Sequence, residues 1–155
     1  MENNYHVDCL GKAVRYIRNS TQRITKFKKC MVASDLESTK FLCEDLPTRW
    51  NSTYEMLKTA VDLRDIYFSY KLEDSGYNHD LERLPEHSDF GACEKLVKFL
   101  ENFKTKTEIV SSPSKPLAHL FFREILDVNK HLWVWDCDPT FSTMITSMRE
   151  KYDKY

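Results

Sequence analysis

Residues 53–72, TYEMLKTAVDLRDIYFSYKL, indicate the fold class of this chain more clearly than any other stretch. Apolar and aromatic residues recur in it at alternating steps of four and three, at Met56, Ala60, Leu63, Tyr67 and Tyr70. Such steps place side chains on one face of an α-helix, which turns about once every 3.6 residues. The stretch therefore predicts one long helix, with a continuous stripe of side chains for a core.

The same period recurs on both sides of this stretch. We expect further helices over residues 5–18, 21–32 and 89–110, one that starts near residue 117, and one that follows Asp138-Pro139. The predicted core positions are Leu10, Val14 and Ile17; Ile24, Phe27 and Met31; Cys93, Leu96, Val97, Leu100 and Phe103; Phe121, Ile125, Val128 and Leu132; and Phe141, Met144, Ile145, Met148 and Tyr152.

Breaks in the pattern separate these helices. Ser20 and Ser88 can serve as N-caps, and residues 33–47 and 73–88 read as irregular, the latter as a polar loop. The stretch SSPSKP at residues 111–116 predicts a turn, and HLWVWDC at 131–137 is a short strand candidate that fits a helix end better. The prediction is an all-α single domain over 1–155 with five to six amphipathic helices, comprising a basic part at 1–34 and a helical core at 48–155.

Composition narrows the class of protein. Glycine occurs only 3 times in 155 residues, which disfavours all-β architectures and glycine-rich phosphate loops. The five cysteines are odd in number and scattered, which fits reduced intracellular thiols better than a disulfide framework. No apolar run is long enough for a signal peptide or a membrane span. We expect no cofactor, no membrane partner and no small-molecule substrate.

Charge is unevenly distributed, although the formal net charge is only −1. Between Cys9 and Ser34 there is no acidic residue. The basic residues of that window are Lys12, Arg15, Arg18, Arg23, Lys26, Lys28 and Lys29. One face of the chain could therefore track the phosphates of DNA, with release of counterions. The alternative is that these side chains are simply the solvated face of amphipathic helices.

Motifs of enzyme chemistry are absent from the sequence, which has no P-loop, nucleophile elbow or His-Glu-x-x-His. His6 and Cys9 have the spacing of a zinc-ligand pair, but no second pair follows. Glu124 and Asp127 lie one helical turn apart and could hold a divalent ion, although such pairs are common on solvated faces. The residues indicate a binding or structural module, and we expect no metal site.

Several blocks resemble the plant-type hAT transposase family, including its domesticated BED zinc-finger members of the RICESLEEPER and DAYSLEEPER kind. The most specific block is DLPTRWNSTYEMLKTAVDLRDIY at residues 45–67. Upstream lies KAVRYIRNSTQRITKFKKC, and downstream follow KLVKFLENFKTKTEIVSS, PLAHLFFREI and MREKYDKY, in the order that the family has them. The resemblance covers nearly the whole chain and implies the helical insertion of an RNase H-like core.

The resemblance also implies what this stretch lacks. Full-length members begin with a DNA-binding BED zinc finger, continue into a catalytic core with an Asp-Asp-Glu triad, and end with a dimerisation segment. The chain is expected to start after the two Asp residues and to stop before the Glu, so no catalytic residue is carried over. We therefore expect a nuclear, non-enzymatic partner of DNA that can associate with a second copy or a transposase-like subunit.

Arg49 and Trp50 are the residues that the resemblance singles out. In the family the Trp stacks on a flipped base as the DNA end folds into a hairpin, and the Arg lies beside it. Extruding a base costs a few kcal/mol, and stacking on an aromatic ring returns roughly 1–3 kcal/mol. Asn51, Ser52 and Thr53 can cap the helix that follows or donate to a phosphate. The alternative for Trp50 is packing between helices, as most Trp residues do.

Three functions remain open on the sequence alone. The first is a DNA-binding fragment that positions bent or hairpin DNA ends. The second is a protein-interaction module on a transposase-like core or dimer partner, with Trp133 and Trp135 as interface anchors. The third is a truncated relic without a retained function.

Overall fold

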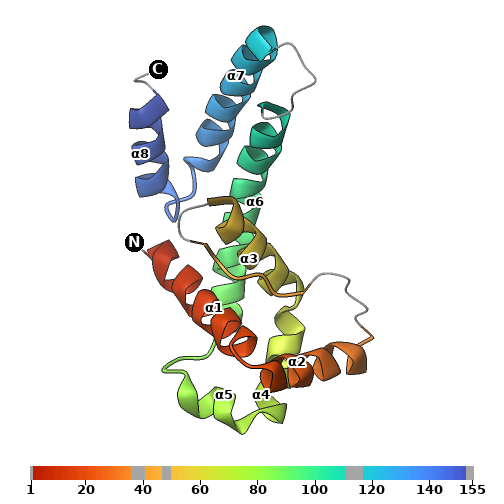
Figure 1. Cartoon of the computed structure of the whole chain (residues 1–155). Coiled ribbons are helices and arrows are strands. Elements are labelled where there is room, and N and C mark those ends of the chain that lie inside the picture. Colours follow the sequence, from red (N-terminus) through yellow and green to blue (C-terminus); the bar gives the residue numbers. More distant parts are fainter. Residues whose placement is uncertain (1, 36–40, 47–49, 111–116, 153–155) are drawn as a thin grey trace. The chain divides into compact units, whose positions relative to one another are not determined.

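The helices and the irregular segments that join them make up the whole of the chain that the structure describes (Figure 1). The structure is a computed structural model that describes residues 2–35, 41–46, 50–110 and 117–152, and these residues contain no strand. None of their helices is both long and apolar enough to cross a membrane. The helices are α1 (Glu2–Arg18), α2 (Thr21–Ala33), α3 (Trp50–Asp62), α4 (Arg64–Glu73), α5 (Ser75–Asp80), α6 (His87–Val110), α7 (Leu117–Trp135) and α8 (Ser142–Tyr152).

The all-α prediction is confirmed, with eight helices in the described residues where five to six were expected. The chain divides into two compact units, residues 1–97 and residues 98–155, and the division falls inside α6. We call them the N-terminal and the C-terminal unit. The single domain, and its division into a basic part and a core, stay predictions. The expected turn at 111–116, and residues 36–40 and 47 of the stretch expected to be irregular, lie outside the described residues.

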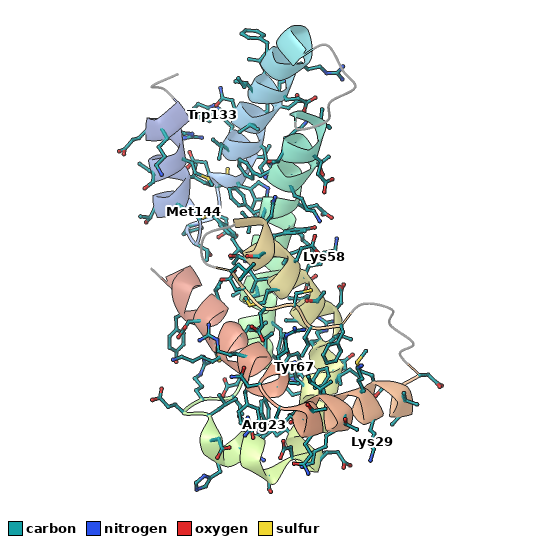
Figure 2. The ribbon with its side chains drawn as sticks, viewed as in Figure 1. Arg23, Lys29, Lys58, Tyr67, Trp133 and Met144 are labelled. Carbon is teal, nitrogen blue, oxygen red and sulfur yellow. The ribbon has the colours of Figure 1, made fainter. Side chains whose placement is uncertain are left out.

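The core of the N-terminal unit forms where α1, α2 and α3 meet and where α2 packs on α4. Phe27 of α2 is fully buried, and its ring lies 5.2 Å from that of Tyr67 and 5.4 Å from that of Tyr70 on α4, between ring centroids. Tyr67 lies in the interior of the unit (Figure 2). The predicted apolar face of α1 is confirmed, since Leu10, Val14 and Ile17 are buried. On α2, Phe27 and Met31 are buried as predicted, whereas Ile24 is only half-buried. Each such aromatic side chain removes about 150–250 Å² from water.

The long helix predicted from residue 53 to residue 72 is instead two helices that meet at Leu63. The backbone of Leu63 has φ −101° and ψ 16°, outside the helical range. Its carbonyl accepts from the Ile66 amide at 2.9 Å, a tighter turn than that of an α-helix. All five stripe residues are nevertheless buried. The period identified the core residues correctly, but it did not reveal the bend.

The expected polar loop at 73–88 is wrong for residues 75–80, which form α5. Asp74 caps this helix, because its carboxylate accepts from the Gly76 amide at 3.3 Å. Tyr77 is buried, with its ring 5.1 Å from that of Tyr70. A Cβ at position 76 would lie 3.0 Å from the Tyr16 hydroxyl oxygen, so only glycine fits there without a shift. A single buried aromatic in a polar stretch is too weak a signal for periodicity to detect.

Two predicted caps differ from those observed. Ser20 precedes α2 as expected, but its side chain makes no capping hydrogen bond. Helix α6 begins at His87, so Ser88 lies inside the helix and is not its cap. The start is fixed by Asp89, whose Oδ2 accepts from the Glu86 amide at 2.8 Å, as in one half of a capping box.

The C-terminal unit is built around Phe99 of α6, which is fully buried. Its ring stacks on that of Phe141 at 5.3 Å, with Trp135 of α7 edge-on at 5.7 Å, between centroids. The stretch HLWVWDC is a helix end as expected, because α7 ends at Trp135. Asp138 accepts from the Thr140 amide at 3.0 Å and starts a turn. Helix α8 therefore begins at Ser142, after the turn, and Pro139 is not in its first turn.

Replacing Phe27 with Ala tests the packing of α2 on α4. We expect the free energy of unfolding to fall by about 3–5 kcal/mol, because the substitution removes a buried ring and leaves a cavity in its place. Urea unfolding followed by circular dichroism measures the change. Leu72→Ala is the matched control, since this side chain is 87% exposed and its removal should change stability by no more than about 0.5 kcal/mol. Equal effects of the two substitutions would contradict this packing.

Candidate nucleic-acid interface

The seven basic residues between Cys9 and Ser34 lie on the first two helices. Lys12, Arg15 and Arg18 belong to α1, and the other four belong to α2. Acids from other parts of the chain reach several of them. The ability of this surface to bind a polyanion therefore depends on how many of the seven cations already pair with acids of the chain. The sequence alone did not reveal these pairs.

Two cations of α1 have acidic partners. Lys12 pairs with Asp8 one turn earlier at 3.0 Å, with both side chains exposed. The guanidinium of Arg18 donates to the Glu44 carboxylate at 3.1 Å and to the Leu42 carbonyl at 2.6 Å. Arg18 thereby ties the segment 41–46 to α1. An exposed i,i+4 pair such as that of Lys12 contributes only about 0.3–0.5 kcal/mol.

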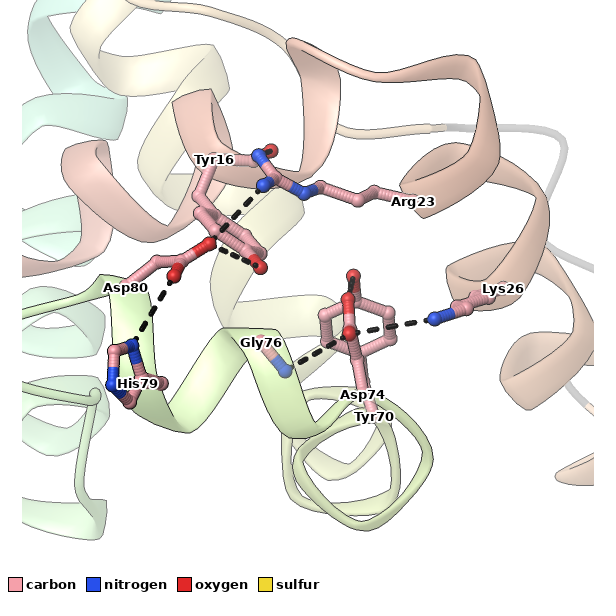
Figure 3. A network of polar contacts seen from close by, with 8 residues as sticks. All are labelled: Tyr16, Arg23, Lys26, Tyr70, Asp74, Gly76, His79 and Asp80. Atoms are coloured by element: carbon pink, nitrogen blue, oxygen red, sulfur yellow. Dashed lines mark hydrogen bonds and ion pairs between the residues drawn. The ribbon is translucent and has the colours of Figure 1, made fainter.

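On α2, Arg23 and Lys26 face acids at the two ends of α5 (Figure 3). Arg23 donates to Asp80 Oδ2 at 3.3 Å and to the Tyr16 carbonyl at 3.2 Å. Its guanidinium carbon lies 3.6 Å from the centroid of the Tyr16 ring, a cation–π contact. The Tyr16 hydroxyl also donates to Asp80 Oδ2, at 3.4 Å. Arg23 is therefore held on several sides.

Asp74 is the buried centre of this network. It accepts from the Tyr70 hydroxyl at 2.5 Å and from Lys26 Nζ at 3.4 Å. Burial alone would raise the pKa of Asp74, but the Tyr70 hydrogen bond and the nearby Lys26 ammonium outweigh it and lower that pKa. Burial and the bond to Asp74 raise the pKa of Tyr70. Asp74 is thus held ionised, and it keeps Lys26 near α5.

Three of the seven cations have no ion pair within the described part of the chain, namely Arg15, Lys28 and Lys29. All three side chains are exposed. Lys28 Nζ lies 5.2 Å from the centroid of the Phe41 ring, which leaves its charge accessible. Lys29 and Arg23 both belong to α2 (Figure 2). These side chains have the positive charge that is least compensated by neighbouring acids.

The Arg-Trp pair is only partly described. Trp50 is the first residue of α3, which begins three residues earlier than expected. Arg49 and the side chain of Trp50 lie outside the described residues. The hydroxyls of Ser52 and Thr53 donate to Asp45 Oδ1 at 3.0 and 2.8 Å, so they join the segment 41–46 to α3. The Ser52 hydroxyl also lies 2.9 Å from the Leu46 carbonyl oxygen, so the acceptors observed for these two hydroxyls belong to the segment 41–46.

The other candidate residues have structural partners. Lys106 of α6 pairs with Glu124 and, at 3.0 Å, with Asp127, so this acid pair binds an ammonium group of the chain. His6 Nδ1 lies 2.6 Å from Asp89 Oδ1 in a contact that joins α1 to α6. Burial raises the pKa of the Cys9 thiol. Among the described residues, no three His, Cys, Asp or Glu side chains gather as a metal site.

Asp89 was missed by sequence reasoning, although it lies at the centre of a second polar network. It is fully buried and also accepts from Arg83 Nη1 at 3.0 Å. Burial would raise the pKa of Asp89, but the hydrogen bonds from His6, the Glu86 amide and Arg83 lower it. An acidic residue at the third position of a helix, three residues after the N-cap, is a capping signal that could have pointed to it.

The two tryptophans expected as interface anchors have different surroundings. Trp133 is 63% exposed, and the guanidinium carbon of Arg149 lies 4.2 Å from the centroid of its ring. Trp135 instead packs against Phe99 and Phe141 inside the C-terminal unit. Only Trp133 presents the exposed ring that an anchor requires.

These features define the chain as an all-α module with cations concentrated on its first two helices. Residues 4–99 match the family described as the ZBED1 RNase-like helical domain. The chain belongs to this family. The match covers α1 to α5 and the first part of α6, and it includes every basic residue of the first two helices discussed above.

Relatives extend the similarity over nearly the whole chain. The chain is 29% identical over 148 residues, 94% of its length, to the zinc finger BED domain-containing protein RICESLEEPER 2 of Oryza sativa subsp. japonica, and these residues are 20% of that protein. It is 29% identical over 136 residues to DAYSLEEPER of Arabidopsis thaliana, covering 86% of the chain and 18% of the relative. It is 27% identical over 151 residues to "Putative AC transposase" of Zea mays, covering 96% and 18%.

The chain thus spans about a fifth of the length of the relatives that it matches. No solved structure matches it. The resemblance to the hAT transposase family, stated from the sequence blocks, is confirmed by the family match and by these relatives.

Asp74 makes stability depend on pH in a direction that can be tested. Its pKa in the folded chain lies below its ordinary value of about 4, so the ionised form stabilises the fold above that value. This contribution is lost as the pH falls through the folded pKa. We expect Asp74→Asn to lower the free energy of unfolding by about 1–3 kcal/mol at neutral pH, and the difference from wild type to shrink towards pH 3.

Urea unfolding at a series of pH values between neutral and about 3 measures this difference. Asp62→Asn is the control, because Asp62 is exposed and has no basic partner among the described residues. If the free energy of unfolding of Asp74→Asn stays below that of wild type by the same amount at every pH, the loss of the Asp74 charge is not the cause of the difference.

Proposed function

We propose that this chain is the DNA-binding helical part of an hAT transposase-like protein, and that it holds bent or hairpin DNA ends without cutting them. The observation that carries the proposal is the group of exposed cations on α1 and α2 that have no acidic partner among the described residues. Membership of the ZBED1 RNase-like helical domain family supports it, as does the transposase name of one relative. The proposal places the protein in the nucleus.

The proposed DNA footprint contains the seven basic residues of α1 and α2 together with Arg49 and Trp50. The seven basic residues contribute unequally to the affinity for DNA. Arg15, Lys28 and Lys29 contribute most, because a phosphate gains their charge without displacing any acid of the described residues. Lys12, Arg18, Arg23 and Lys26 contribute less, since each would first have to leave a carboxylate of the chain. Every phosphate that is neutralised releases counterions, which makes the affinity depend steeply on salt.

Arg49 and Trp50 give the proposed site its preference for distorted ends. An unpaired base can stack on an indole ring, and an Arg can pair with the phosphates that crowd together at a sharp bend. The rest of the surface would bind intact duplex as well, since phosphate contacts carry no sequence information. Cleavage would require the carboxylate triad of the longer relatives, which we assign to the rest of such a protein.

The triple variant Arg15→Gln/Lys28→Gln/Lys29→Gln tests the footprint. Fluorescence anisotropy with a labelled hairpin-ended duplex gives the binding constant between about 50 and 200 mM salt. We expect weaker binding at every salt concentration. The slope of log K against log salt should be shallower by about 0.9 for each phosphate that the variant no longer neutralises.

The matched control is Arg123→Gln/Lys130→Gln/Lys151→Gln, which removes one Arg and two Lys from exposed positions in the C-terminal unit. Equal losses of affinity in the two triple variants would show that only net charge matters and would reject the footprint. A wild-type chain that binds no DNA at low salt would reject the proposed function itself.

The role of Trp50 has a separate test. Trp50→Ala should weaken binding to hairpin-ended DNA by about 1–3 kcal/mol, the worth of one stacked base, and leave binding to plain duplex nearly unchanged. Trp50→Phe keeps an aromatic face and should retain most of the preference. If Trp50→Ala instead lowers the stability of the fold and affects both DNAs alike, Trp50 is a packing residue.

A further inference from the structure

Three cations form a row on α2 that winds partly around the helix, because each step of three residues turns it by about 60°. Arg23, Lys26 and Lys29 are spaced at i, i+3 and i+6, so neighbouring members lie about 5–6 Å apart at their Cβ atoms. The first two face the acids at the ends of α5 (Figure 3). Lys29 has no acidic partner among the described residues. Arg23 and Lys26 are therefore paired with carboxylates of the chain, whereas the charge of Lys29 is available to a ligand.

The two acids that face the row are held very differently. Asp74 is buried, takes the Tyr70 hydroxyl at 2.5 Å and caps α5, so it is part of the framework. The side chain of Asp80 is 47% exposed and lies at the last residue of α5. Its hydrogen-bond donors are Arg23 at 3.3 Å and Tyr16 at 3.4 Å, and His79 Nδ1 lies 3.6 Å from its other oxygen.

The pair of Arg23 and Asp80 is of the kind that a competing anion can displace. Strong pairs between charged groups have distances of about 2.7–2.9 Å, which is shorter than the 3.3 Å found here. A partly exposed pair contributes little to stability and is screened by salt. The Arg23 side chain would nevertheless stay positioned, because the Tyr16 ring and carbonyl also hold it.

We propose that Asp80 competes with DNA phosphates for Arg23 and so limits the affinity of the α2 row for DNA. This inference rests on the proposed function and adds an element that controls it. With Asp80 in place, a phosphate at Arg23 must displace a carboxylate of the chain. When Asp80 carries no charge, Arg23 joins Lys29 as an available cation on α2. Asp74 stays in place throughout and keeps α5 against α2.

The test compares Asp80→Asn with Asp62→Asn in the whole chain. Both substitutions remove one negative charge from the N-terminal unit, but only Asp80 pairs with Arg23. By anisotropy with the hairpin-ended duplex, we expect Asp80→Asn to bind about two- to fivefold more tightly, the range of one exposed ion pair. Its slope of log K against log salt should be steeper by about 0.9, for one more neutralised phosphate. Asp62→Asn should remain close to wild type.

Arg23→Gln provides the second arm. In an Arg23→Gln background, Asp80→Asn should give no gain over Arg23→Gln alone, and circular dichroism should show the helix content of the wild type in each variant. A gain that persists without Arg23, or one that Asp62→Asn matches, overturns the competition while DNA binding by the wild type stands. Failure of the wild type and of every variant to bind DNA rejects the proposed function and the inference with it.

Discussion

The burial of Phe27 against Tyr67 and Tyr70 is the contact on which the N-terminal unit depends. It joins α2 to α4, which are far apart along the chain, through aromatic rings that are almost entirely removed from water. Lys26 precedes Phe27 on α2, and Asp74 directly follows α4. Packing the ring of Phe27 onto α4 therefore also brings Lys26 to Asp74. The apolar contact determines which acid meets which base.

Two buried carboxylates convert this packing into defined helix ends. Asp74 lies between α4 and α5 and Asp89 in the first turn of α6, and each contacts a backbone amide and side chains from other parts of the chain, including another helix. A buried charge is costly unless hydrogen bonds satisfy it. These bonds lower the pKa of both carboxylates although burial opposes this. The same groups cap helices and connect them.

The electrostatics follow from this arrangement and not from composition. A window without acids appears strongly basic, yet Arg18, Arg23 and Lys26 meet carboxylates that come from later parts of the chain. The charge that a polyanion would meet is therefore smaller than the count of Lys and Arg suggests. Asp80, the acid at the end of α5 that pairs with Arg23, is itself about half exposed.

The sequence by itself determined the helical fold class, the core stripe from Met56 to Tyr70 and the family, because period and ordered motifs are local properties of the chain. Only the tertiary structure decided the bend at Leu63, the short helix α5 around Tyr77, and the partners of the basic residues. For α5 and for the basic residues the physical reason is the same, because each depends on groups brought together from distant positions. Periodicity records which face is buried, but it does not record what that face, or the charge beside it, will meet.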